Sequence, residues 1–259
     1  MCEVVIIRTL QAVILLLSCT LTTKAQLTES DTLLWGYQWS SSASYLSGNV
    51  ERFLWINRFA FSHSEEVWGF KSSTHHQYGT IRRQLTENDV ISKNFVYLYP
   101  RKRFYPFMIL WLESHQRRAI DFRYQWGAGL SYVLIQKANH RLKPSLKVTY
   151  EKSKFQRNDF EEDRFDNSFE IDTWRLAGRL IGSHFLWKRK LNFSYEFWYQ
   201  QSLQTWDNYR YYVDMKLSFA INKLLALQAL FSQSYESIVL EGVQRKDTYF
   251  SYGLTLGNF

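Results

Sequence analysis

The chain has 259 residues, is 18% aromatic, contains only 3 prolines and carries a formal charge of +8 at pH 7. Its basic residues are spread over turns and alternate strand positions and form no single stripe, which argues against a nucleic-acid-binding protein. Both cysteines, Cys2 and Cys19, lie within the first 25 residues, so disulfide and thiol chemistry is excluded from the rest of the chain.

The first 25 residues have the pattern of a secretory signal peptide. Arg8 supplies a positive charge, Leu10–Leu21 forms a short apolar core, and Ala25 ends a small-residue cleavage site. This core is too short for a spanning helix, which needs ~20 residues. We therefore expect an exported domain over residues 26–259, with lipoprotein processing at Cys19 as the alternative.

Most of the remaining chain alternates apolar and polar residues with the period of two that predicts β-strands. The twelve predicted strands cover approximately residues 33–45, 50–62, 67–80, 88–99, 104–114, 122–134, 142–151, 168–186, 191–200, 209–221, 225–231 and 247–259. The fifth strand is apolar on both parities, so the sequence does not decide which of its faces points inward. In the eighth strand the apolar parity shifts between Ile171 and Trp174, which predicts a β-bulge.

The predicted hairpin 191–221 has the clearest alternation. Phe193, Tyr195 and Phe197 share its apolar face, whereas Glu196 and Asp214 lie on its polar face. A soluble sheet packed on a partner and a barrel wall facing lipid both produce this pattern. The hairpin alone therefore leaves both architectures open.

Connection lengths favour the membrane barrel. Twelve strands leave ~19 residues for each strand with its turn, against the ~10 residues that a tilted spanning strand needs. The longest predicted loop, Lys152–Asn167, is an odd-numbered connection, whereas the short turns are even-numbered. Long loops at one end and short turns at the other are typical of bacterial outer-membrane barrels. We predict an all-β, closed antiparallel transmembrane barrel of twelve strands, with ten as the alternative, in the cell outer membrane.

The last strand ends in an aromatic residue. Tyr252 and the terminal Phe259 resemble the C-terminal signal by which outer-membrane barrels are recognised during assembly. The expected partners are therefore outer-membrane lipid and the barrel-assembly machinery, with no nucleic acid.

The chain also resembles the domain-of-unknown-function family 481, typified by the salt-induced outer-membrane protein. The resemblance rests on the Gly48-Asn49 turn, on the glycine-containing strand from Gly127 to Leu134 and on the run of aromatic hairpins, and it covers about residues 48–259. It implies a barrel with no established biochemical activity and supplies no catalytic residues. The Gly127-x-Gly129 pair is not a nucleotide loop, because no third glycine and no helix follow.

The charged parity of the strands is the candidate functional site. Its members, expected to line the lumen, are Arg123, Lys143, Lys147, Glu151, Glu196, Arg210, Asp214 and Lys216. Such a lumen is either a structural set of ion pairs or a selective channel for small solutes or ions. Trp198 and Tyr212, which are bulky and on the same parity, predict a narrow lumen.

Other functions lack their chemical groups. An outer-membrane lipid hydrolase needs a histidine and a serine on one strand face, whereas His63 and Ser64 are adjacent and diverge. His75 and His76 diverge likewise, and the acidic loop 159–166 lacks the EF-hand pattern, so we expect no metal, no cofactor and no catalysis. A soluble periplasmic barrel or sandwich that binds an apolar ligand stays the alternative.

Overall fold

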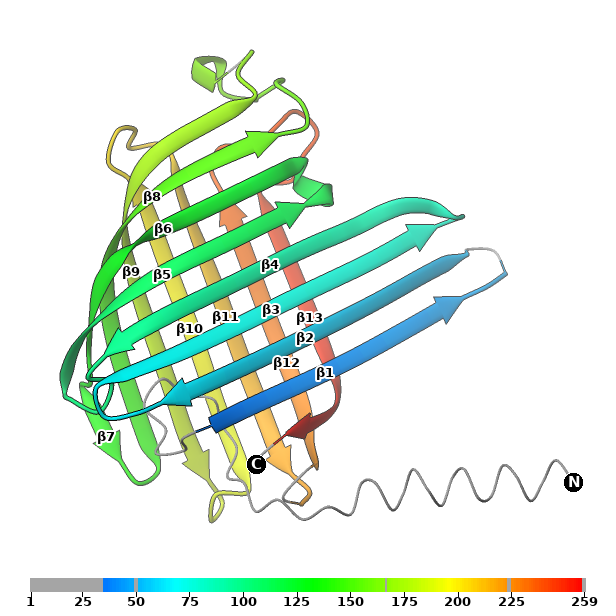
Figure 1. Cartoon of the computed structure of the whole chain (residues 1–259). Coiled ribbons are helices and arrows are strands. Elements are labelled where there is room, and N and C mark those ends of the chain that lie inside the picture. The colour runs from blue at the N-terminus through cyan, green and yellow to red at the C-terminus, as the bar shows by residue number, and fades with distance from the viewer. Residues whose placement is uncertain (1–34, 49–50, 166, 223–224, 258–259) are drawn as a thin grey trace, which may run out of the picture.

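The computed structural model describes residues 35–48, 51–165, 167–222 and 225–257, which form one antiparallel sheet curled into a barrel (Figure 1). The strands are β1 (Trp35–Leu46), β2 (Arg52–Ser64), β3 (Trp68–Ile81), β4 (Gln84–Leu98), β5 (Phe104–His115), β6 (Ile120–Tyr132), β7 (Ile135–Lys137), β8 (His140–Phe155), β9 (Glu170–Leu186), β10 (Leu191–Ser202), β11 (Tyr209–Ala220), β12 (Leu225–Glu236) and β13 (Lys246–Gly257). Two short 3-10 helices, η1 (Gln116–Arg118) and η2 (Asp163–Phe165), lie in connections.

Twelve long strands make the wall. Each pairs with its neighbours in the chain, except that β6 pairs directly with β8. The three-residue β7 pairs only with the first residues of β8, so it belongs to the connection between β6 and β8. The predicted twelve-stranded barrel is therefore confirmed.

The barrel is nearly closed, and its seam lies between β1 and β13. Among the described residues these strands share two register pairs, Gln38 with Gly257 and Trp39 with Leu256. Figure 1 shows the two strands diverging from this point toward the other end of the barrel. The predicted signal peptide 1–25 and the terminal Phe259 lie outside the described residues.

The predicted alternation decides which side chains face outward. Large apolar residues such as Trp39, Phe197 and Leu217 lie on the outer face with 40–57% of their surface exposed. Their inward neighbours are buried or half-buried instead, and Trp198 has no exposed surface. No helix in the described ranges is long and apolar enough to cross a membrane.

The sequence of the fifth strand did not decide which of its faces points inward. In the structure the odd-numbered residues of β5 point into the barrel. Tyr105, Phe107, Ile109 and Trp111 are buried in the barrel, while Met108 faces outward with 63% of its surface exposed. Both parities are apolar because the outward residues face the apolar exterior and the inward residues pack on other aromatic side chains.

The bulge predicted in the eighth strand is wrong. β9 pairs with β8 and with β10 without a register shift. Ile171 points inward and packs on Phe155 and Phe160, so the change of parity reflects a buried apolar contact at the mouth of the barrel.

The two ends of the barrel differ. At the end that we call the turn end, the connections are short, as at residues 65–67, 99–103 and 187–190. At the other, the loop end, residues 156–165 with 167–169 and residues 237–245 form longer loops that meet through a bridge between Phe160 and Leu240. The loop predicted from Lys152 is therefore partly packed and begins after Phe155.

Candidate functional site

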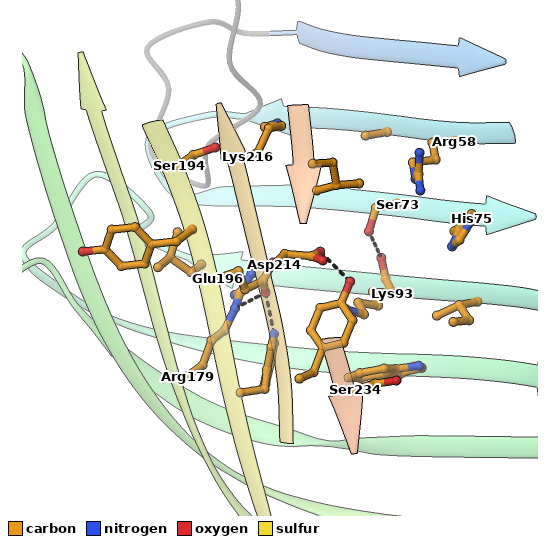
Figure 2. Close-up of a pocket in the computed structure, with 18 of the residues that line it drawn as sticks. Arg58, Ser73, His75, Lys93, Arg179, Ser194, Glu196, Asp214, Lys216 and Ser234 are labelled. Atoms are coloured by element: carbon orange, nitrogen blue, oxygen red, sulfur yellow. Dashed lines mark hydrogen bonds and ion pairs between the residues drawn. The ribbon is translucent and has the colours of Figure 1, made fainter. Parts of the chain in front are cut away.

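A cavity of about 390 Å³ occupies part of the lumen. It is lined by inward residues of nearly every long strand, including Ser40 of β1, Lys71 of β3, Lys93 of β4 and Lys216 of β11. Figure 2 shows charged side chains from opposite walls turned toward one another across this space. The alternation of each strand produces the arrangement, because every second residue of a barrel wall points inward.

Positive charge dominates the cavity lining. Its basic side chains are Arg58, Lys71, Lys93, Arg118, Lys143, Arg179, Arg210 and Lys216. Its carboxylates are Glu113, Glu196, Asp214 and Glu236. Eight cations against four anions leave an excess of four positive charges.

The carboxylates of the cavity are already engaged. Glu196 accepts a hydrogen bond from Nε of Arg179 at 2.7 Å and another from the Trp198 indole at 2.5 Å. Asp214 accepts a hydrogen bond from the Tyr212 hydroxyl. These contacts hold the acidic groups against the wall and compensate little of the remaining positive charge.

Four of the cations lack such a partner. Among the residues that the structure describes, no carboxylate lies within 4.0 Å of the charged groups of Arg58, Lys71, Lys93 or Lys216. Lys93 instead has its Nζ 4.4 Å from the centroid of the Trp111 ring and 4.2 Å from that of Tyr212. An aromatic face stabilises a cation without neutralising it, so the charge stays available to a solute.

Aromatic side chains fill the lumen beside the cavity. The cluster contains Phe95, Tyr97, Tyr105, Phe107, Ile109, Trp111, Val133 and Trp198. Ring centroids of Phe95 and Trp198 lie 6.4 Å apart, and those of Trp111 and Trp198 lie 6.0 Å apart. Since Trp198 is on β10 and the other two are on β4 and β5, which are not its neighbours in the wall, these contacts cross the lumen and narrow it.

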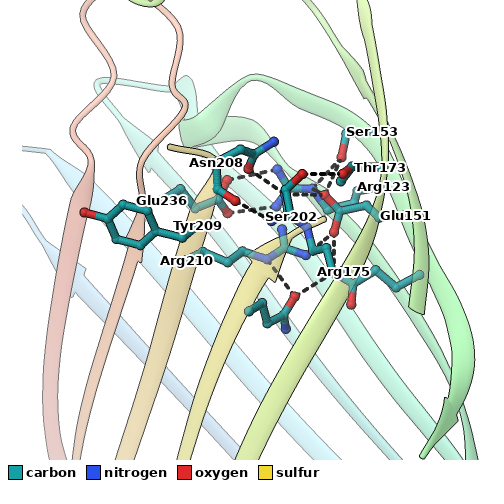
Figure 3. Close-up of polar contacts among 12 residues, drawn as sticks. Arg123, Glu151, Ser153, Thr173, Arg175, Ser202, Asn208, Tyr209, Arg210 and Glu236 are labelled. Carbon is teal, nitrogen blue, oxygen red and sulfur yellow. Dashed lines mark hydrogen bonds and ion pairs between the residues drawn. The ribbon is translucent and has the colours of Figure 1, made fainter. Parts of the chain in front are cut away.

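A network of buried ion pairs lies at the loop end of the lumen (Figure 3). Glu151 on β8 accepts hydrogen bonds from Arg175 on β9, at 3.1 Å, and from Arg210 on β11. Arg123 on β6 donates to both carboxylate oxygens of Glu236 on β12, at 2.8 and 2.9 Å. Glu113 lies 3.6 Å from Arg123 and brings the network to three arginines and three carboxylates. The network ties strands of different parts of the wall together and is a structural element, because its charges are matched and largely buried.

The mouth above this network is covered by an apolar cap. The cap contains Ala119, Ile120, Phe155, Phe160, Ile171, Ile238 and Leu240. Arg245 fastens the two loops of the cap by donating to Glu161 at 3.0 Å. The hydrogen bonds that Arg245 donates to the Glu161 carboxylate raise the pKa of Arg245, so this link stays charged at any physiological pH.

Arg118 joins η1 to the opposite side of the mouth. Its Nη2 donates to Asp247 at the start of β13 at 2.6 Å. Burial would lower the pKa of Arg118, but the carboxylates of Glu236 and Asp247 outweigh burial and raise it. The contact therefore holds η1 over the lumen as a permanent ion pair.

The structure places all eight predicted lumen residues at inward positions, but in two separate groups. Lys143, Glu196, Arg210, Asp214 and Lys216 line the cavity, whereas Arg123 and Glu151 belong to the buried network, which Arg210 also joins. Lys147 lies between the groups, with its Nζ 4.4 Å from the Trp198 ring. The predicted set thus mixes residues that a solute could touch with residues that it could not.

Sequence reasoning missed Arg58, Lys71, Lys93 and Arg179. Arg58, Lys71 and Arg179 occupy the polar parity of their strands, and that parity was the signal that could have identified them. Lys93 shares its parity with the apolar Phe95 and Tyr97, so the alternation of its strand does not mark it.

The other residues singled out in the sequence lie apart from the cavity or do not form a metal site. His63 bonds Glu65 at 3.0 Å near the turn end, beside Ser64. His75 points into the cavity while His76 stands on the other parity, and no group of three or more metal-ligating side chains occurs within the described ranges. Tyr252 is on the outer face with 80% of its surface exposed.

A family model matches this wall almost from end to end. The family described as "Protein of unknown function, DUF481" matches residues 40–257. The chain belongs to the DUF481 family. The resemblance to this family, which rested on the glycines and aromatic hairpins of the sequence, is confirmed. None of the curated proteins compared with the chain matches it.

Solved structures similar to this DUF481 protein are outer-membrane barrels. The NanC porin matches with a TM-score of 0.50 and 11% identity over 88% of this chain and 100% of that chain. The β domain of the Bordetella autotransporter BrkA gives 0.39 and 9% over 86% and 97%, and a bacterial polysaccharide outer membrane secretin gives 0.43 and 8% over 86% and 80%. The match to the porin establishes a porin-like barrel fold, and at this identity it establishes the fold alone.

Proposed function

We propose that this DUF481 protein lies in the outer membrane and forms a narrow passage for small hydrophilic anions, without catalysing a reaction. The observation that carries the proposal is the excess of four positive charges in the cavity, with four cations that have no carboxylate within 4.0 Å. A cleft lined by one sign of charge between low-dielectric walls concentrates counter-ions. Anions should therefore enter the lumen in preference to cations.

The outer face supports a lipid environment. Trp35, Trp39, Leu217 and Phe250 are among the large apolar residues that stand outward with 44–64% of their surface exposed. In water such a surface would be an aggregation site, whereas in a bilayer it meets hydrocarbon. We place the turn end in the periplasm and the loop end outside the cell, following the asymmetry of bacterial barrels.

A narrow bore follows from the aromatic cluster and the cap. Trp198, Trp111 and Phe95 occupy lumen space on one side, and the two loops cover part of the mouth. A twelve-stranded wall is intermediate between small barrels filled by side chains and wide porins. The passage that we propose would therefore admit small solutes and exclude large ones.

Electrical recording tests the proposal. Purified protein is reconstituted into planar bilayers of neutral lipid, and single-channel currents are recorded under a KCl gradient. We expect discrete small conductances with a reversal potential of the sign that chloride permeation gives. Absence of current in verified insertions, or a potassium-selective current, would overturn the proposal.

The expectation of no catalysis has its own test. His63 is hydrogen-bonded to Glu65 at the turn end, and among the residues that the structure describes none is a hydrogen-bond partner that could activate Ser64. We expect no release of fatty acid from phospholipid in detergent micelles. A release that disappears in Ser64→Ala would establish a hydrolase.

Fractionation tests the soluble alternative. Recovery of the native protein in the soluble periplasm without detergent would favour a soluble protein that binds an apolar ligand over the membrane barrel.

A further inference from the structure

The seam between β1 and β13 is open over most of its length. From Ser40 to Leu46 the outer edge of β1 has no register partner on β13, although β1 pairs along its whole length with β2. β13 likewise pairs with β12 from Lys246 to Leu256. Figure 1 shows β1 and β13 separating toward the loop end, so each presents an edge of unpaired backbone groups at this place.

Open edges are costly inside a bilayer, because hydrocarbon offers no hydrogen-bond partners to backbone groups. A protein keeps such a gap only where water, another polar group or a ligand reaches it. The lumen supplies that access here, since Gln38 and Ser40 of β1 line the charged cavity. The cavity therefore borders the seam on its β1 side.

Arg58 stands at the junction of cavity and seam. It lies on β2 opposite Ser40, and its guanidinium reaches across to β13, 5.5 Å from the centroid of the Tyr249 ring. In the described part of the chain it has no carboxylate within 4.0 Å. Lys71 and Lys216, which also line the cavity, add two further positive charges without a carboxylate partner.

We propose that the seam is a lateral binding site for an anionic, single-chain amphiphile. The head, a carboxylate, sits in the cavity against Arg58, and the acyl chain runs out between β1 and β13 into the bilayer. The inference uses the same cavity as the proposed passage but does not depend on ion conduction. A small hydrophilic anion would not need the seam, whereas an amphiphile needs both the cations and the apolar exit.

The chemistry of the two parts favours this ligand over others. An uncharged lipid would leave the cations without a partner, and charged groups take the strongest hydrogen bonds from guanidinium. The cavity of about 390 Å³ accepts a head and the first carbons of one chain. A lipid with two chains would have to separate Gln38 and Trp39 from β13 as well, where the strands are still paired.

Photolabelling tests the site. The full protein is reconstituted into phosphatidylcholine vesicles with palmitate that carries a diazirine in its chain, irradiated, and mapped by mass spectrometry. We expect labels concentrated on the facing edges, at residues 42–46 and 249–253. Met215 and Leu217, on the outward face of β11, report labelling by bulk lipid. Unlabelled palmitate should compete, whereas its methyl ester and phosphatidylglycerol should not.

A matched pair of variants tests the role of the cation. Arg58→Gln should weaken labelling on the order of tenfold, the loss expected for one charge-assisted hydrogen bond. Arg83→Gln, which removes an exposed charge from the turn between β3 and β4, should leave labelling unchanged.

Three results would overturn the inference: equal labelling of all outward faces, competition by the methyl ester, or competition by phosphatidylglycerol. The comparison of acid with ester uses the native protein, so it stands even if Arg58→Gln folds poorly. Labelling at the seam in a protein that passes no current would reject the proposed passage and leave this site intact.

Discussion

The Nζ atom of Lys147 lies 4.4 Å from the centroid of the Trp198 indole, and both side chains are buried in the lumen. Arg179 approaches the same ring, with its guanidinium carbon 4.7 Å from the centroid. One aromatic residue thus holds two cations beside the cavity, and cation–π contacts of this kind strengthen when they are desolvated.

We predict that Trp198→Ala strongly destabilises the barrel, because it removes a fully buried side chain, its stacking on Phe95 and its contacts with two cations. The expected loss is about 3–5 kcal/mol, the usual cost of a large aromatic truncation. Urea unfolding in lipid vesicles measures it. Trp206→Ala, in an exposed loop, is the control, and equal losses in the two variants would contradict the prediction.

Glu151 is predicted to be necessary for stability. Glu151→Gln leaves Arg175 and Arg210 without their shared carboxylate in a buried site. Removing one member of such a network costs about 3–5 kcal/mol. The same unfolding measurement applies, with Glu66→Gln in an exposed turn as the matched change. A variant as stable as its control would mean that water replaces the carboxylate.

Two glycines of the wall should respond differently to alanine. A Cβ at Gly127 would collide with the backbone of Val148 and Thr149 on the neighbouring strand, whereas a Cβ at Gly178 has no atom within 4 Å. We expect Gly127→Ala to cost about 1–3 kcal/mol through overpacking. Gly178→Ala should be neutral or slightly stabilising, because alanine loses less backbone entropy than glycine on folding. Equal stability of both variants would show that the strands simply move apart.

The cap should limit the current. Phe160 is buried where the two loops meet, so Phe160→Ala should loosen them and raise the single-channel conductance. Phe169→Ala changes an exposed residue of the same loop and should leave conductance unchanged. Single-channel recording distinguishes them, and an unaltered conductance in Phe160→Ala would place the constriction elsewhere.

Period-two alternation predicted most of the fold, because the two faces of a barrel strand meet different surroundings. Alternation did not predict the inward face where both faces of a strand are apolar, each because of different surroundings. In β5, Met108 faces outward while Phe107 and Ile109 pack into the lumen, and sequence cannot separate these environments. The β-bulge predicted near Ile171 is wrong for a related reason. Ile171 points inward because it packs on Phe160, a loop residue that the alternation of the strand does not include.

The candidate site was less predictable than the wall. Parity places charged residues in the lumen, but it does not distinguish a neutralised charge from an unpaired one. Glu151 and Lys216 both lie on the inward parity of their strands. Glu151, however, is paired with two arginines, whereas Lys216 faces the cavity without a carboxylate partner. That difference depends on which strands approach across the lumen, and the alternation of single strands contains no such information.

Charge inversion in the lumen tests whether the cations of the cavity make the passage selective for anions. The reversal potential of single channels is measured under one KCl gradient for the native protein, for Lys71→Glu/Lys216→Glu, and for Arg82→Glu/Arg83→Glu, which inverts the same number of exposed charges at a turn. We predict chloride selectivity in the native protein and the turn variant and a shift toward potassium in the lumen variant. The difference should be smaller at 1 M salt, where the Debye length falls to about 3 Å. The same reversal potential in the native protein and the lumen variant would contradict this prediction.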